Sequence, residues 1–285
     1  MPDSPAPSPS SRLQAAQALL GDSDNEVASL AMECILKSGK AEESLATLQD
    51  TADKNVRKRA HQLGTLLHQD AILRQLVQDY EQARLSALDG MMRIDLLYDT
   101  SSSLTFLQEQ LTALETEFKK GIRGPLTFSK LCQSMERMDF FVPPLPWLAI
   151  EDYLIGDVLD GDGGASPLVL STLCRHLATP RGLPVTIATC NGFIGFTHGD
   201  WVCLPEQGWQ SRQLTRQDEL CPLHDQQIFQ LYLCQMLAGA MASWEAYDVH
   251  LFLEIYQSLF GLKGNPLPYP FGDLGLRQPP QPDAP

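Results

Sequence analysis

The chain has 285 residues and a formal net charge of −14, from 21 Lys and Arg against 35 Asp and Glu. This charge disfavours contact with a phosphate backbone, so we expect no nucleic acid partner. No apolar run approaches the roughly 20 residues that cross a bilayer, so we expect no membrane protein. The length is sufficient for one large domain or two smaller ones with a substantial core.

The amino-terminal composition and the cysteines indicate the compartment. Residues 1–10 are rich in Pro and Ser and are predicted to be disordered. They have neither the basic start nor the apolar stretch of a secretory signal. The seven cysteines are odd in number and lie mostly in apolar patterns, which indicates reduced, buried thiols. We therefore expect a cytoplasmic protein.

Residues 11–68 have a helical pattern with a possible internal repeat. Asp24 precedes Val27, and Asp53 precedes Val56, with the same spacing, so each Asp is a candidate N-cap. The pattern is similar to HEAT-like units, which are short helix pairs. Two copies fall short of the three that a solenoid needs, so an ordinary helical bundle remains open.

Three helical segments follow. Residues 70–99 are predicted to form one long amphipathic helix or a broken pair, with Gly90 as a possible break. Residues 101–119 and 126–138 are predicted to form two further helices. The prolines of residues 140–147 exclude a regular helix, so we expect an extended strap across the core, or alternatively an exposed peptide-binding patch.

Residues 147–159 are predicted to form a helix that leads into an acidic loop. The carboxylates of this region are Glu151, Asp152, Asp157, Asp160 and Asp162. The loop lacks the further oxygen ligands and the distal Glu of an EF-hand, so we interpret it as a solvated acidic loop and not a calcium site. No CxxC or HxxxH pair occurs, and no P-loop, so we expect no metal and no cofactor.

The most informative stretch is residues 157–209. Ser166 is a candidate N-cap and Pro167 the first residue of a helix that ends before Gly182. A β-branched strand begins at Val185, and Asn191-Gly192 predicts a hairpin turn. Residues 201–204 predict another strand. A helix packed on a small antiparallel sheet is therefore expected.

The remainder is predicted to be helical. Residues 210–222 are interpreted as a polar connector, residues 225–241 and 245–260 as an antiparallel helix pair, and residues 264–285 as a Pro-rich tail.

Two cysteine–histidine combinations are candidates for chemistry. Cys190 lies near His198 and Asp200 in the sequence, whereas Cys174 and His176 are two residues apart and face different directions on a helix. A nucleophilic cysteine needs a setting that lowers its pKa, and neither segment supplies one. A cysteine hydrolase or acyltransferase using Cys190 and His198 is therefore the alternative hypothesis.

Several short motifs carry a family resemblance. Gly164-Ala165-Ser166-Pro167 and Gly182-Leu183-Pro184-Val185, with Tyr153-Leu154 before them, resemble the transglutaminase-like core of the bacterial SirB family over roughly residues 70–260. The resemblance implies an α+β fold, predominantly α. It would comprise a degenerate transglutaminase-like, papain-like core with a small antiparallel sheet (69–222) and a carboxy-terminal helical pair (223–263), which follow the HEAT-like region (11–68) indicated by the repeat pattern.

The same resemblance implies a pseudoenzyme. The superfamily Cys, His and Asp positions fall on Pro167, Phe193 and Leu204, none of which can perform the chemistry. We therefore expect a non-catalytic interaction or regulatory protein that binds a protein or peptide partner. The expected binding groove contains Ser166, Phe193, His198 and Trp209. A structural subunit of an oligomer is the second alternative.

Overall fold

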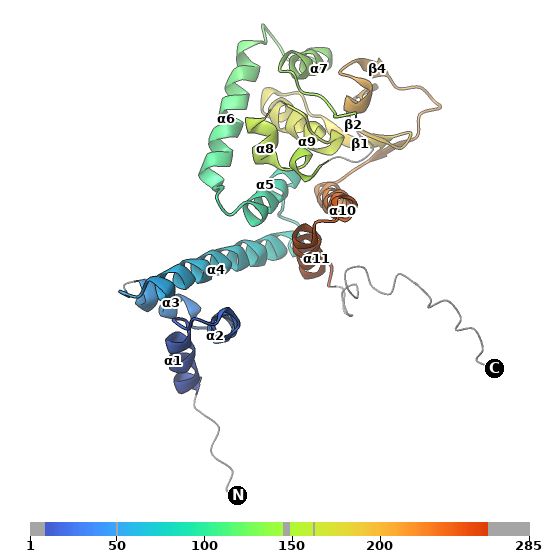
Figure 1. Ribbon diagram of the computed structural model, residues 1–285. Helices are drawn as coiled ribbons and strands as arrows, with labels where there is room; N and C mark the ends of the chain where they lie inside the picture. Colours follow the sequence, from blue (N-terminus) through green and yellow to red (C-terminus); the bar gives the residue numbers. More distant parts are fainter. Residues whose placement is uncertain (1–8, 50, 145–148, 162, 262–285) are drawn as a thin grey trace, which may run out of the picture. The chain divides into compact units, whose positions relative to one another are not determined.

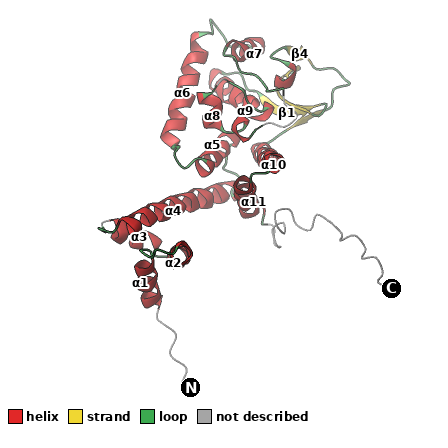
Figure 2. Ribbon diagram, viewed as in Figure 1, coloured by secondary structure: helices red, strands yellow, loops and turns green. Residues whose placement is uncertain are grey.

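The computed structural model describes residues 9–49, 51–144, 149–161 and 163–261 and divides the chain into two compact units, residues 1–74 and 75–285. Residues 1–8 of the predicted disordered start (1–10), residues 145–147 of the predicted strap, Asp162 and the predicted tail lie outside the described residues, whereas residues 9 and 10 are helical, contrary to the prediction. The fold is α+β and predominantly α, with helices α1 to α11 and one small antiparallel sheet in the described residues (Figures 1 and 2).

The first unit consists of helices. They are α1 (Pro9–Leu19), α2 (Asn25–Lys37), α3 (Ala41–Gln49) and the amino-terminal part of α4 (Lys54–Glu81). The Asp24 carboxylate accepts a hydrogen bond from Glu26 N (2.8 Å), and the Asp53 carboxylate accepts from Val56 N (3.2 Å). Both predicted N-caps are thus confirmed, because each satisfies a backbone donor that the first helical turn leaves free.

The small residues of these helices allow close packing around a buried cluster. Its members are Ala16, Leu20, Ala31, Ile35, Ala41, Leu48, Ala60 and Leu63. Arg59 adds a polar connection: its guanidinium donates to the carbonyl oxygens of Leu20 and Asp22 and to Asn25 Oδ1. These bonds satisfy carbonyls that follow the end of α1.

The second unit begins with the end of α4 and contains most of the chain. Its helices are α5 (Ala87–Tyr98), α6 (Leu104–Lys120), α7 (Phe128–Arg137), α8 (Ile155–Asp160), α9 (Pro167–Ala178), α10 (Asp225–Ser243) and α11 (Ala246–Phe260). Single turns of 3₁₀ helix are η1 (Ile150–Asp152), η2 (Thr179–Arg181) and η3 (Pro205–Gln207). Ser86, Ser103, Thr127 and Ser166 each cap a helix by accepting from the backbone N–H three residues along.

The strands are β1 (Thr186–Cys190), β2 (Phe193–His198), β3 (Trp201–Cys203), β4 (Ser211–Gln213) and β5 (Leu220–Pro222), in the order β4-β3-β2-β1-β5 with antiparallel neighbours. Asn191 (φ 53°) and Gly192 (φ 85°) join β1 to β2. Two positive φ values are what a two-residue hairpin turn requires, and Asn-Gly adopts them readily.

The sheet has two different faces. Phe196 contacts Phe128 of α7 (5.3 Å between ring centroids) and Trp209 (6.4 Å), so its side of β2 is the helical face. On the opposite face, Cys190, Val202 and Leu204 form a small core of their own. Since strand side chains alternate between faces, this register decides which candidate residues can meet.

Several predicted element boundaries are wrong. The predicted helix 70–99 is a pair whose break lies at residues 82–86, where Ala83 has φ 52°, and Gly90 is inside α5. The predicted helix 147–159 is divided into η1 and α8. The predicted connector 210–222 contributes β4 and β5, two edge strands too short to show an alternating pattern.

Candidate functional site

Ser166 does not line a groove. Its side chain is completely buried, and Oγ accepts a hydrogen bond from Val169 N at 3.3 Å, which confirms the predicted N-cap. The backbone N–H of Ser166 donates to Asp152 O at 2.8 Å. The turn before α9 is therefore a structural joint, with the serine hydroxyl occupied by the helix end.

The other three residues of the expected groove are also not brought together. Phe193 and His198 are five positions apart on β2, so they lie on opposite faces of the sheet. His198 donates from Nδ1 to Pro184 O (2.6 Å) and stacks near Phe128 on the helical face. Trp209 is only 7% exposed and donates from its indole N–H to Phe140 O. Of the four, only Phe193, at 42% exposure, presents a large apolar surface.

The strand register separates Cys190 from His198. Cys190 pairs with Phe193 at one end of the hairpin, whereas His198 lies at the other end, roughly 16 Å along β2. Cys190 is buried near Asp218 and Arg212, and burial together with the Asp218 charge raises the pKa of its thiol. A raised thiol pKa and a distant imidazole do not make a nucleophile–base pair.

Cys174 and His176 likewise do not form a nucleophile–base pair. Cys174 is fully buried in α9, and burial raises the pKa of its thiol. His176 instead points to α6, where Nε2 lies 3.0 Å from Glu115 Oε1.

The three positions that the resemblance assigns to a catalytic triad do not converge either. Pro167 is buried at the start of α9. Phe193 and Leu204 lie on the face of the sheet opposite the one that Phe196 presents to the helices. Leu204 packs with Cys190 and Val202, and its Cδ2 lies under Gly195, whose missing side chain makes room for it. Pro167 and Leu204 are packed in the interior, and Phe193 is partly exposed.

A hollow elsewhere in the second unit has stronger features of a site. It measures about 710 Å³ and lies where the end of α5, the start of α6, η1 and α8 meet. Five carboxylates line it: Asp95, Asp99, Glu151, Asp157 and Asp160. We call this hollow the acidic pocket. Its lining contains neither Lys nor Arg.

Asp95 is the buried member of the acidic pocket. It is 3% exposed, and its Oδ2 accepts a hydrogen bond from Gly156 N at 2.6 Å. Burial raises the pKa of Asp95 to about 6, the Gly156 hydrogen bond opposes this rise, and the nearby charges of Asp157 and Asp99 add to it. A carboxylate in such surroundings gains most from a cation that enters the pocket.

The rim carboxylates repel one another. Burial, followed by the charges of Glu151, Asp99 and Asp160, raises the pKa of Asp157. In the same region, burial and the charges of Asp248, Glu151 and Asp157 raise the pKa of Tyr98 to about 12. Within the described ranges, none of the five pocket carboxylates forms an ion pair with a Lys, Arg or His.

Two further features of the lining suit a cationic ligand. Ser102 Oγ is shielded from solvent and has no hydrogen-bond partner in the described structure, so it can accept a bond from an entering N–H group. Phe106, which is 39% exposed, lines the same pocket, whereas the ring of Tyr98 is stacked on Phe252. Aromatic faces attract ammonium and guanidinium groups.

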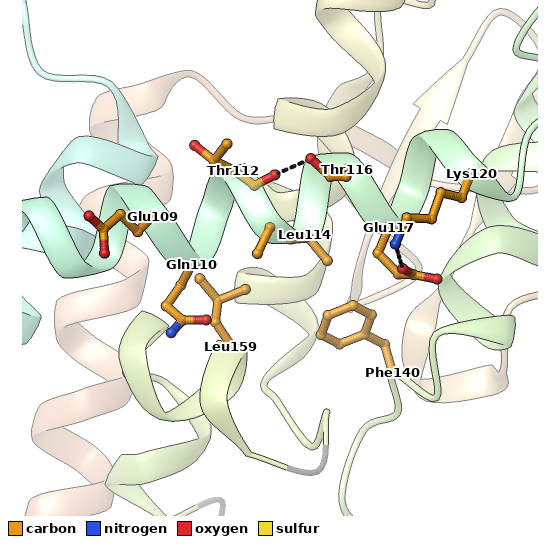
Figure 3. Close-up of a pocket in the computed structure, with 10 residues that line it drawn as sticks. Glu109, Gln110, Thr112, Leu114, Thr116, Glu117, Lys120, Phe140 and Leu159 are labelled. Carbon is orange, nitrogen blue, oxygen red and sulfur yellow. Dashed lines mark hydrogen bonds and ion pairs between the residues drawn. The ribbon is translucent and has the colours of Figure 1, made fainter.

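A second hollow, of about 620 Å³, lies along α6 and differs in charge. Figure 3 shows Gln110 and Leu114 on α6 directed toward Leu159 and Phe140. Here Lys120 Nζ pairs with Glu117 Oε2 at 2.9 Å, so part of the charge is already neutralised. The mixed surface has no buried titratable group and provides a comparison for the acidic pocket.

Metal coordination is not favoured at either hollow. Among the described residues, no group of three or more His, Cys, Asp or Glu side chains has an arrangement that could hold a metal ion. The acidic pocket is wide enough for an organic cation, and its carboxylates are spread over several elements instead of converging on a point.

The sequence analysis contains three of the five pocket carboxylates, Glu151, Asp157 and Asp160, which it interprets as part of a solvated acidic region. It does not predict Asp95 and Asp99, because their approach to these residues depends on how α5 packs on α8. One signal existed: Asp95 interrupts the apolar pattern of Met91, Ile94 and Leu97, which indicates a buried carboxylate.

Comparisons of this chain with protein-family models, with curated proteins and with solved structures gave no match. In the part of the chain that the structure describes, no helix combines the length and the apolar character needed to cross a bilayer.

Proposed function

We propose that this chain is a non-catalytic interaction protein, and that the acidic pocket binds a Lys or Arg side chain of a partner protein. The observation that carries the proposal is the set of five pocket carboxylates without a cation among the residues that line the hollow. Asp95 is buried and the other four carboxylates are exposed around it. A buried charge is costly unless it is paired, so a basic side chain in the pocket would supply the missing partner.

The absence of an assembled nucleophile supports the non-catalytic part of this proposal. The Ser166 hydroxyl is used as a helix cap, and Cys190 is far from His198. Pro167 and Leu204 are packed in the interior, Phe193 is partly exposed, and none of these three side chains has a nucleophilic or basic group. All seven cysteines are free thiols, which fits the proposed cytoplasmic location.

Binding of a Lys- and Arg-rich peptide, measured by isothermal titration calorimetry on the full chain, tests this proposal. Replacing two rim carboxylates, Glu151→Gln with Asp157→Asn, is expected to raise the Kd about tenfold or more, because two partly desolvated charge contacts are lost. The affinity is expected to fall as the salt concentration rises.

The matched control removes two carboxylates from elsewhere on the surface. Glu109→Gln with Glu136→Gln changes the net charge equally and uses exposed residues outside the acidic pocket, so the Kd should change little. Equal weakening by both double variants would reduce the effect to overall charge and would refute the assignment of the pocket.

A further inference from the structure

Helix α4 carries a row of cations on its exposed side. Lys54, Arg57 and Lys58 are all exposed, and their spacing places them on one face over roughly 6 Å of helix. We call this row the basic stripe. No ion pair with a carboxylate is formed by Lys54, Arg57 or Lys58 in the described ranges.

The stripe works against the helix that carries it. Lys54 and Arg57 lie in the first turns of α4, where the positive end of the helix dipole disfavours a cation. Lys54 and Lys58 are also four residues apart, so they are like charges on neighbouring turns. Arg59 is different, because its guanidinium is used in hydrogen bonds to Leu20 and Asp22. Helix stability therefore does not account for the stripe.

The stripe is also unusual within the composition of the chain. Residues 1–74 contain eight Lys and Arg against ten Asp and Glu, whereas the remaining residues contain 13 against 25. The concentrated basic charge thus lies in the first unit, and the acidic pocket lies in the strongly acidic second unit.

We infer that the basic stripe of one copy of this chain binds the acidic pocket of a second copy. The inference rests on the proposed function, since it names the partner that the pocket holds. Charge complementarity carries it: the stripe has cations without anions, and the pocket has anions without cations.

The contact joins two different surfaces, so it is heterologous. A dimer formed in this way still has one free stripe and one free pocket. Further copies can therefore add at either end and form an open filament, unless the assembly closes into a ring. Sedimentation velocity of the full chain should therefore show an average mass that rises with concentration. The effect should be clear at an ionic strength of about 0.1 M and lost at about 1 M, where the Debye length falls from about 10 Å to about 3 Å.

Two charge-reversed variants test the surfaces. The stripe variant carries Lys54→Glu, Arg57→Glu and Lys58→Glu, and the pocket variant carries Glu151→Lys, Asp157→Lys and Asp160→Lys. Each variant alone is expected to self-associate at least about tenfold more weakly than the natural chain. The control, Lys37→Glu with Lys119→Glu and Lys120→Glu, matches the charge change of the stripe variant at exposed lysines that already have partners. If it associates as weakly as the stripe variant, overall charge and not the stripe is responsible. The pocket variant changes the net charge in the opposite direction, so a loss of association there cannot come from added negative charge.

Mixing the two variants gives the sharpest result. The stripe variant retains a natural pocket and the pocket variant a natural stripe, so these two surfaces should bind in a one-to-one mixture. The reversed surfaces, a Glu-bearing stripe and a Lys-bearing pocket, are complementary as well, so the mixture should regain an association that neither variant shows alone. This outcome cannot arise from misfolding of either variant. A mixture that remains monomeric while the natural chain associates would overturn the inference.

The remaining outcomes are equally decisive. A natural chain that stays monomeric at about 0.1 M salt overturns the inference; if it still binds the basic peptide through the pocket, the proposed function survives. If the natural chain neither binds the basic peptide nor associates, both the proposed function and this inference are refuted. Tight binding of a single-stranded RNA that only the stripe variant loses would assign the stripe to nucleic acid instead.

Discussion

Asp95 is the residue whose chemistry depends most on its surroundings. On α5 it faces inward among apolar neighbours, and its one observed hydrogen bond comes from Gly156 N. Its pKa of about 6 exceeds the ordinary value because burial and nearby carboxylates both disfavour the charge. The folded state therefore holds this proton more tightly than the unfolded state, and Asp95 favours folding at acidic pH.

We expect Asp95→Asn to stabilise the free protein at pH 7. The stabilising effect of the raised pKa is complete below about pH 4 and is lost as the pH rises through 6, so the ionised carboxylate costs up to about 3 kcal/mol at neutral pH. Asparagine keeps an oxygen for the Gly156 N–H and removes this cost. Urea unfolding should show a gain at pH 7 that disappears at pH 4. A variant less stable than the natural chain at pH 7 would contradict this account.

At the scale of elements, Gly90 allows a close approach between α5 and α10. A Cβ atom built at Gly90 would come within 2.6 Å of Phe229 Cδ2, and Phe229 is fully buried. Glycine is ordinarily unfavourable inside a helix. Here it allows two helices to approach with a phenyl ring between them.

We therefore expect Gly90→Ala to destabilise the second unit by about 1–3 kcal/mol, since the strain of the added methyl exceeds the gain in helix propensity. Gly64→Ala is the control, because the nearest atom there is Leu45 Cδ2 at 3.4 Å, an ordinary contact. It should be neutral or stabilise by up to about 1 kcal/mol. Thermal unfolding followed by circular dichroism compares the two. Recovery of Gly90→Ala by Phe229→Leu would confirm the cause, and equal stabilisation by both alanines would refute it.

The whole molecule consists of two compact units with separate cores. In the first unit, Leu63 is fully buried in a cluster with Leu20 and Ile35. In the second unit, α9 has ten of its 12 residues buried. Units with separate cores are expected to open separately.

Leu63→Ala should consequently act on one unit only. The lost packing is expected to cost about 2–5 kcal/mol and to reduce hydrogen-exchange protection in residues 9–49 and the start of α4. Protection of α9 and of strands β1 and β2 should not change. Leu66→Ala, on the same helix but 42% exposed, serves as the control and should leave both regions protected. Loss of protection throughout the chain would mean a single cooperative unit.

Local signals determined much of the secondary structure. The N-caps Asp24, Asp53 and Ser166, the Asn191-Gly192 hairpin and the α10–α11 pair are all as the sequence predicts, because each depends on residues within a few positions of one another. The short edge strands β4 and β5 were missed, since three residues pair only when a neighbouring strand is already in place.

The sequence by itself determined the α+β class, the capped helix starts and the central helix-and-hairpin unit, which follow from periodicity and turn chemistry. Only the tertiary structure decided the candidate site. The alternation of side chains on β2 put Phe193 and His198 on opposite faces, and packing closed the space around Ser166 and Trp209. Packing of α5 against α8 brought Asp95 to the carboxylates of a loop about 60 residues later, because charges distant in sequence meet only where apolar burial of their helices places them.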